Sequence, residues 1–117
     1  MKNSASKKRE SHRFTNAIDF LIESVVKEID PLKIIVFGSW ARGENKPDSD
    51  VDLLIVMPEG IHRRRTAQML YRNIRGVSIP FDLIIATSSD LEKHRNNIGL
   101  IYSTILAEGK EVYARRN

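Results

Sequence analysis

Near its start the chain carries apolar residues at the spacing of one face of an α-helix. They recur three or four positions apart, as Phe14, Ala17, Ile18, Leu21, Ile22, Val25, Val26 and Ile29. Asp30-Pro31 follows this run, and proline ends a helix because its ring clashes with the preceding turn and it has no amide hydrogen. The pattern therefore predicts a helix over residues 14–29.

Three short apolar segments further along have the composition of β-strands. They span residues 34–37, 51–57 and 81–86, are rich in β-branched and aromatic side chains, and are bounded by glycine, proline or aspartate. The first of them does not alternate between apolar and polar residues, so we expect both of its faces to be buried. Residues 112–114 give a weaker signal for a last short strand.

Two further segments have helical spacing. Residues 62–75 contain no acidic residue and carry five arginines, Arg63, Arg64, Arg65, Arg72 and Arg75. Residues 90–107 predict a last helix, with Ser88 or Ser89 as its N-terminal cap and Gly109 at its C-terminal end. The order helix, strand, strand, helix, strand, helix predicts an α/β (α+β) fold, a small sheet with helices packed on it.

The size and charge of the chain narrow the picture. A chain of 117 residues with 41% hydrophobic residues forms one folded domain, and a large substrate must be held partly by another molecule. The formal charge of +4 lies in residues 1–13, because the basic and acidic residues of the remainder cancel. We predict a flexible basic tail over residues 1–13 and one domain over residues 14–117. The arginine-rich helix is interpreted as a solvated face, with contact to an acidic or RNA-bearing partner as the alternative.

Other features exclude whole classes of protein. The chain has no cysteine, which rules out a disulfide scaffold and thiol chemistry. Its apolar runs are shorter than the ~18 residues of a membrane span, and its polar start does not have the pattern of a signal peptide. We expect a cytoplasmic protein without a membrane partner.

Two aspartates stand at the entrance of the second predicted strand. Side chains two positions apart on a strand point to the same face, so Asp50 and Asp52 project together. Asp82 lies among apolar residues of the third strand, where a charge is costly, and can complete a cluster of three carboxylates. Mg²⁺ prefers such oxygen ligands together with substrate phosphates, and three carboxylates can hold two ions. The alternative for Asp50 and Asp52 is turn chemistry, to which Asp48 is also assigned.

Gly38-Ser39 ends the first predicted strand. Glycine permits a backbone that points successive N–H groups at an anion, and the hydroxyl of Ser39 and the guanidinium of Arg42 can add donors to phosphate oxygens. Neither a P-loop nor a Gly-x-Gly-x-x-Gly pattern is present. Trp40 either borders this nucleotide site or is a packing residue.

The order Gly38-Ser39, ten residues, then Asp50-x-Asp52, within GSWARGENKPDSDVDLLIV, resembles the signature of the DNA polymerase β-like nucleotidyltransferase superfamily. The short chain resembles the minimal nucleotidyltransferase (MNT) branch over residues 14–114, with Asp82 in PFDLII as the third carboxylate. The resemblance implies a mixed sheet with flanking helices, a nucleoside triphosphate bound through Gly38 and Ser39, and Mg²⁺ held by the three aspartates Asp50, Asp52 and Asp82.

The same resemblance implies a partner. MNT proteins of this kind commonly act as antitoxins that transfer AMP from ATP to a tyrosine of a HEPN ribonuclease toxin, so we expect a hetero-oligomer with such a toxin. Two alternatives stay open: an antitoxin that masks the toxin without catalysis, and a nucleotidyltransferase acting on RNA or a small molecule. We expect no direct binding to nucleic acid, because residues 14–117 have no net charge.

Overall fold

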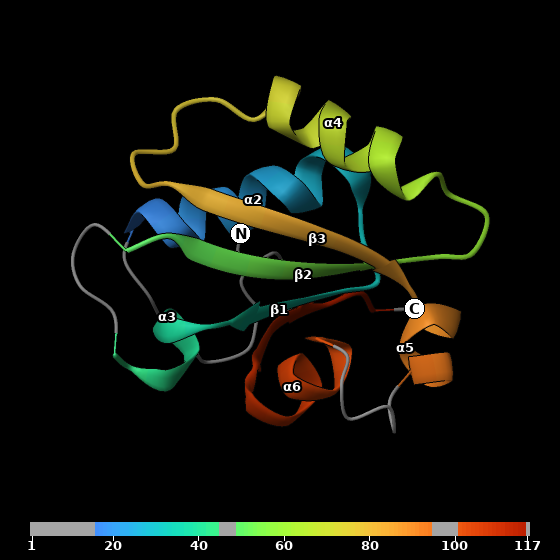
Figure 1. The fold of residues 1–117 in the computed structure, drawn as a ribbon. Coiled ribbons are helices and arrows are strands. Elements are labelled where there is room, and N and C mark those ends of the chain that lie inside the picture. The colour runs from blue at the N-terminus through green and yellow to red at the C-terminus, as the bar shows by residue number, and fades with distance from the viewer. Residues whose placement is uncertain (1–15, 45–48, 95–100, 117) are drawn as a thin grey trace.

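A computed structural model describes residues 16–44, 49–94 and 101–116, without the side chains of residues 94 and 101. These residues form helices and strands in nearly alternating order, shown in Figure 1. The helices are α2 (Asn16–Ile29), α3 (Ser39–Arg42), α4 (Arg63–Asn73), α5 (Ser88–His94) and α6 (Ile101–Glu108). The strands are β1 (Lys33–Phe37), β2 (Val51–Met57), β3 (Phe81–Thr87) and β4 (Lys110–Ala114).

The four strands form one mixed sheet in the order β3-β2-β1-β4. β1 is antiparallel to both of its neighbours, β2 and β4, whereas β2 and β3 are parallel. A parallel pair needs a crossover connection, and α4 supplies it between β2 and β3. The first residues of β2 and β3 therefore lie at the same end of the sheet as the end of β1.

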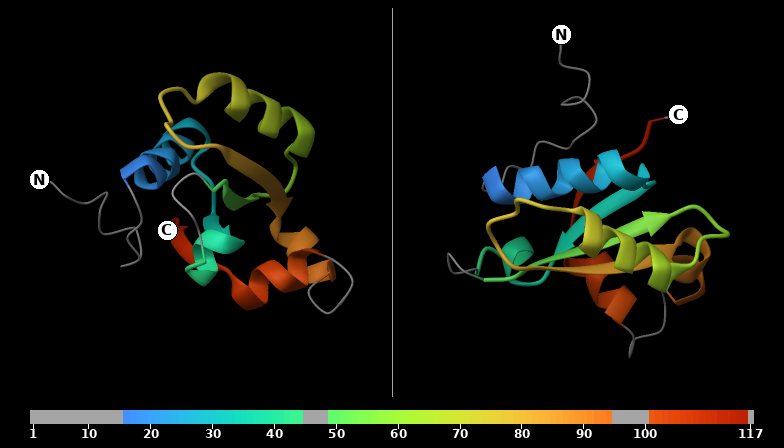
Figure 2. Two further views of the ribbon diagram at one scale, coloured as in Figure 1. Left: turned by 60° about the vertical axis from the view of Figure 1, so that its left-hand side comes forward. Right: turned by 90° about the horizontal axis from the view of Figure 1, so that it is seen from above.

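Helices cover both faces of the sheet, as the two views of Figure 2 show. Alternate strand residues point to opposite faces, and each face has its own apolar cluster. One cluster joins the sheet to α2 and α4 through buried residues such as Leu21, Val36, Leu53 and Leu70. The other joins it to α5 and α6 through Ile35, Leu54, Val56, Ala86 and Ile105. The result is a three-layer α/β/α arrangement, which confirms the predicted fold class.

The predicted strands are confirmed with small changes at their ends. β2 begins and ends as expected, β1 begins one residue earlier and β3 ends one residue later. The weak signal at residues 112–114 belongs to β4, which pairs with β1. The absence of alternation in β1 also has the expected cause, because its three central residues are buried between the two helical layers.

The prediction of one helix over residues 90–107 is wrong. The structure has two helices there, α5 and α6, which contact each other and both reach the same apolar cluster, through Leu91 and Ile105. The predicted cap at Ser88 or Ser89 is also wrong. Thr87 takes that role: its Oγ1 accepts from the N–H of Asp90, and the Asp90 carboxylate accepts from the N–H of Thr87. This reciprocal pair is a capping box.

Gly109 ends α6 as predicted, with its N–H donating to the carbonyl of Ile105 at 2.7 Å. Its φ is not positive, so a left-handed cap is not the reason for glycine here. A Cβ at this position would lie 2.4 Å from Cγ2 of Ile35, and the close approach of α6 to β1 therefore requires glycine.

Some predictions concern residues outside the described ranges. The basic tail over residues 1–13, the start of the first helix at Phe14 and the turn around Asp48 all fall there. In the described part of the chain, every helix is too short or too polar to cross a lipid bilayer.

Candidate nucleotide and metal site

The parallel pairing of β2 with β3 brings two of the three predicted carboxylates together. Asp52 and Asp82 are direct partners in the register of the two strands. Asp52 lies two residues before Leu54, and Asp82 two residues before Ile84, so both aspartates point to the same face of the sheet as these residues. This is the face that α5 and α6 cover further along the strands. Asp50 is exposed and lies two residues before Asp52, just ahead of β2. All three predicted ligands therefore lie at one end of the sheet, with Asp52 and Asp82 on the same face.

The charge of this cluster has no compensating partner among the residues that the structure describes. Partial burial raises the pKa of Asp52, and the neighbouring carboxylates of Asp82 and Asp50 raise it further. Within the described residues, none of the three carboxylates has a hydrogen bond or an ion pair with the protein. A carboxylate that loses solvent among other anions is stabilised by a cation, so the donor set fits a hard divalent ion.

The carboxylates are not already closed around a metal position. Among the residues that the structure describes, no three histidine, aspartate or glutamate side chains converge closely enough to hold an ion. A bound ion would therefore draw the three carboxylates together and take its remaining ligands from water and substrate.

Gly38 lies directly beside the Asp52 carboxylate. A Cβ at position 38 would be 2.5 Å from Oδ2 of Asp52, and the backbone of Gly38 has φ 77° and ψ −154°, a region open essentially to glycine alone. Phe37, the residue before Gly38, lies opposite Asp52 in the antiparallel pairing of β1 with β2. α3 starts at the next residue, Ser39, which is half-buried. The structure thus places Gly38 next to the Asp52 carboxylate, with Ser39 as the following residue in the chain.

Two hydrogen bonds hold the segment that carries Asp50. The indole Nε1–H of buried Trp40 donates to the carbonyl of Ser49 at 3.0 Å, and the N–H of Val51 donates to the carbonyl of Pro80 at 3.0 Å. The packing interpretation of Trp40 is therefore correct, and its indole also fixes the approach to Asp50.

Arg42, a predicted phosphate ligand, is engaged by acidic side chains. Its Nε lies 2.9 Å from Oε1 of Glu44 and its guanidinium 3.6 Å from Oε1 of Glu108. These glutamates, Glu44 above all, raise the pKa of Arg42. The structure brings Arg42 to the end of α3, but its guanidinium is held by carboxylates.

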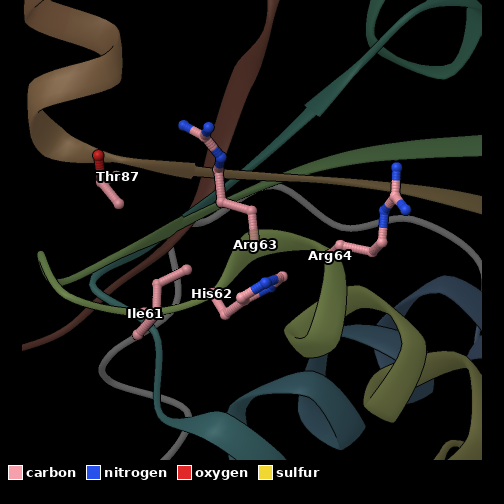
Figure 3. A pocket seen from close by; sticks show the side chains of 5 residues that line it. All are labelled: Ile61, His62, Arg63, Arg64 and Thr87. Carbon is pink, nitrogen blue, oxygen red and sulfur yellow. The ribbon is translucent and has the colours of Figure 1, made fainter.

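A pocket of about 430 Å³ lies at the opposite end of β2 and β3. Figure 3 shows its lining, which comprises Ile61, His62, Arg63, Arg64 and Thr87. His62 caps α4 by accepting the N–H of Arg65 on Nδ1, and Arg63 pairs with Asp90 at 2.6 Å. The pocket contains none of the residues predicted to bind nucleotide, so it is separate from the candidate site.

The chain belongs to the family of nucleotidyltransferase domains, whose pattern it matches over residues 18–110. The match includes the proposed phosphate segment and all three aspartates. A comparison with curated proteins gives no match.

Two solved structures share the fold. One is a putative nucleotidyltransferase from Sulfolobus solfataricus, with 23% identity, a TM-score of 0.54, and coverage of 91% of this chain and 94% of the other. The second is a toxin-antitoxin structure with AMP-PNP, with 18% identity, a TM-score of 0.53, and coverage of 87% of this chain and 76% of the other. At these identities the likeness concerns the fold.

Proposed function

We propose that this chain is a Mg²⁺-dependent nucleotidyltransferase that moves AMP from ATP to a partner protein. The partner proposed is a HEPN ribonuclease toxin, modified on a tyrosine, which makes this chain its antitoxin. The observation that carries the chemistry is the juxtaposition of Asp52, Asp82 and Gly38: two carboxylates in register, beside a backbone position where no side chain fits.

Each residue at this end of the sheet has a role in the proposal. Asp50, Asp52 and Asp82 hold the metal, and Gly38 lets the triphosphate approach the backbone without obstruction. The Ser39 hydroxyl donates to a phosphate oxygen. Bound Mg²⁺, as two ions, would lower the pKa of the attacking hydroxyl and neutralise the phosphoryl group. Arg42 is the weakest candidate of the nucleotide site, because Glu44 and Glu108 already engage its guanidinium.

The acceptor must come from another molecule. The described residues are used for the sheet and its two helical layers, and the pocket beside α4 lies at the far end of β2 and β3. In-line attack on the α-phosphate of ATP, with pyrophosphate as the leaving group, needs the acceptor hydroxyl held close to that phosphate. A docked protein can supply this hydroxyl at high effective concentration. Added phosphate on a tyrosine near a ribonuclease site would repel RNA, which accounts for an antitoxin role.

The toxin-antitoxin structure with AMP-PNP supports this choice of partner. We test it by co-expressing the chain with the product of its neighbouring gene and measuring the partner by intact mass spectrometry. The partner should gain the mass of one or more AMP units, and Asp50→Asn in the nucleotidyltransferase should abolish the gain. Neutralisation of the partner without any mass change would favour the masking antitoxin instead.

A further inference from the structure

Tyr71 of α4 contacts both neighbours of Asp82 in the chain. Its ring stacks on Phe81, with centroids 5.7 Å apart and planes inclined by 12°. Its hydroxyl oxygen accepts the N–H of Leu83 at 2.8 Å. One side chain therefore holds the residues immediately before and after a proposed metal ligand.

The bond to Leu83 matters because β3 is an edge strand. β3 pairs with β2 on one side only, so alternate N–H groups of β3 point to an edge that has no neighbouring strand. The Tyr71 hydroxyl takes the place of the missing strand at Leu83. The N–H of Leu83 and the carbonyl of Asp82 belong to the same planar peptide unit, so fixing one fixes the other.

The start of β3 is thus held from two sides. On the inner side, the N–H of Val51 donates to the carbonyl of Pro80, and on the outer side Tyr71 accepts from Leu83. The two peptide planes that flank Asp82 together set the direction of its Cα–Cβ bond. The side chain of Asp82 is exposed and its carboxylate has no hydrogen bond in the described structure, so the backbone sets the Cβ position from which the carboxylate extends.

We propose that Tyr71 is a positioning residue that holds Asp82 opposite Asp52 for binding of the divalent ion. The proposal rests on the proposed function, because it assumes that these carboxylates are metal ligands. Tyr71 acts through the backbone of β3 and touches neither the ion nor the nucleotide. The ring contact needs an aromatic residue only, whereas the bond to Leu83 needs the tyrosine hydroxyl.

The experiment compares Tyr71→Phe with the wild-type chain. Phenylalanine keeps the ring on Phe81 and removes the acceptor for Leu83. Tyr113→Phe is the matched control, because the Tyr113 hydroxyl contacts Asp30 at 3.5 Å near the far end of the sheet. Phe81→Leu is a second variant that removes the stacking partner but keeps an apolar side chain. Mn²⁺ affinity is measured by electron paramagnetic resonance, and exchange of the Leu83 amide hydrogen by NMR.

In Tyr71→Phe the Leu83 amide should exchange about fivefold faster or more, since one hydrogen bond is lost. Mn²⁺ affinity should fall by roughly tenfold, the lower end of the range for residues that orient metal ligands. Phe81→Leu should also lower Mn²⁺ affinity. Tyr113→Phe should change neither Mn²⁺ affinity nor the exchange rate of the Leu83 amide.

The outcomes separate this inference from the proposed function. If Asp52→Asn abolishes Mn²⁺ binding but Tyr71→Phe binds Mn²⁺ like the wild type, the role of Tyr71 is refuted and the site stands. Unchanged exchange of the Leu83 amide in Tyr71→Phe would refute it equally. If the wild-type chain binds no Mn²⁺, both proposals are wrong.

Discussion

Asp52 of β2 and Asp82 of β3 face each other as direct partners in the parallel part of the sheet. Two like charges in register disfavour the ionised state, which is one reason for the raised pKa of Asp52. Repulsion between the two carboxylates lowers the free energy of unfolding of the protein. The proposed function accounts for the arrangement by a cation that these carboxylates would bind.

The first prediction concerns that cost. Because the pKa of Asp52 is raised in the folded protein, ionised Asp52 destabilises the fold. Asp52→Asn removes the charge and keeps the shape, so it should raise the melting temperature at neutral pH in the presence of a chelator. The gain should fade as the pH falls through the raised pKa and be gone below about pH 4, where the wild-type carboxyl is also protonated. A variant that melts lower than the wild type at neutral pH would show that Asp52 has a stabilising partner.

The second prediction concerns the contact between Gly38 and Asp52. Gly38→Ala should destabilise the fold by about 1 to 3 kcal/mol, because alanine is strained in this backbone region. It should also displace the Asp52 carboxylate, since the added Cβ would lie 2.5 Å from Oδ2. We therefore expect a large loss of Mn²⁺ and ATP affinity by calorimetry.

Gly60→Ala is the matched control for Gly38→Ala. Gly60 also has a positive φ, 93°, but a Cβ there would have no atom within 4 Å. This variant should lose stability without losing affinity for either ligand. Equal ligand affinities in the two glycine variants would argue against a role of Gly38 at the site.

The third prediction separates stability from ligand binding. The hydrogen bond from Arg63 and, to a smaller extent, the one from the Thr87 backbone N–H lower the pKa of Asp90 to about 2. Because the pKa of Asp90 is lower in the folded protein, ionised Asp90 stabilises the fold at pH values above its ordinary pKa near 4. This stabilisation is lost as the pH falls toward about 2. Asp90→Ala should lower the free energy of unfolding by about 1 to 2 kcal/mol at neutral pH through loss of the capping box. Denaturant titrations of both proteins should converge in strong acid, and Mn²⁺ affinity should stay at the wild-type value, because α5 starts at the opposite end of the sheet.

The sequence predicted the four strands and most of the helices, and it proposed the residues of the candidate site. Strands β2 and β3 were visible because apolar runs end at proline or aspartate, and Asp82 stood out as a charge inside such a run. Asp50, Asp52, Asp82 and Gly38 could be proposed together because their order and spacing resemble the signature of the DNA polymerase β-like nucleotidyltransferase superfamily.

Contacts between distant segments were beyond the sequence. The capping role of Thr87 depends on the exact end of β3, and the separation of α5 from α6 depends on how both helices pack under the sheet. The link between Tyr71 and Leu83 exists only because β3 is an edge strand that α4 covers, which requires the strand order. Arg42 was assigned to phosphate because the sequence does not reveal its contact with Glu108 of α6, which forms only in the folded chain.

Calorimetric titration of ATP in the presence of Mg²⁺ tests the central claim most directly, because it needs no acceptor. The wild-type chain should bind Mg²⁺-ATP, and addition of a chelator should abolish binding. The double variant Asp50→Asn/Asp52→Asn should remain folded and lose at least about 2 kcal/mol of binding free energy, since two charged ligands are removed. Unchanged affinity for Mg²⁺-ATP in a folded double variant would contradict the assignment of this site.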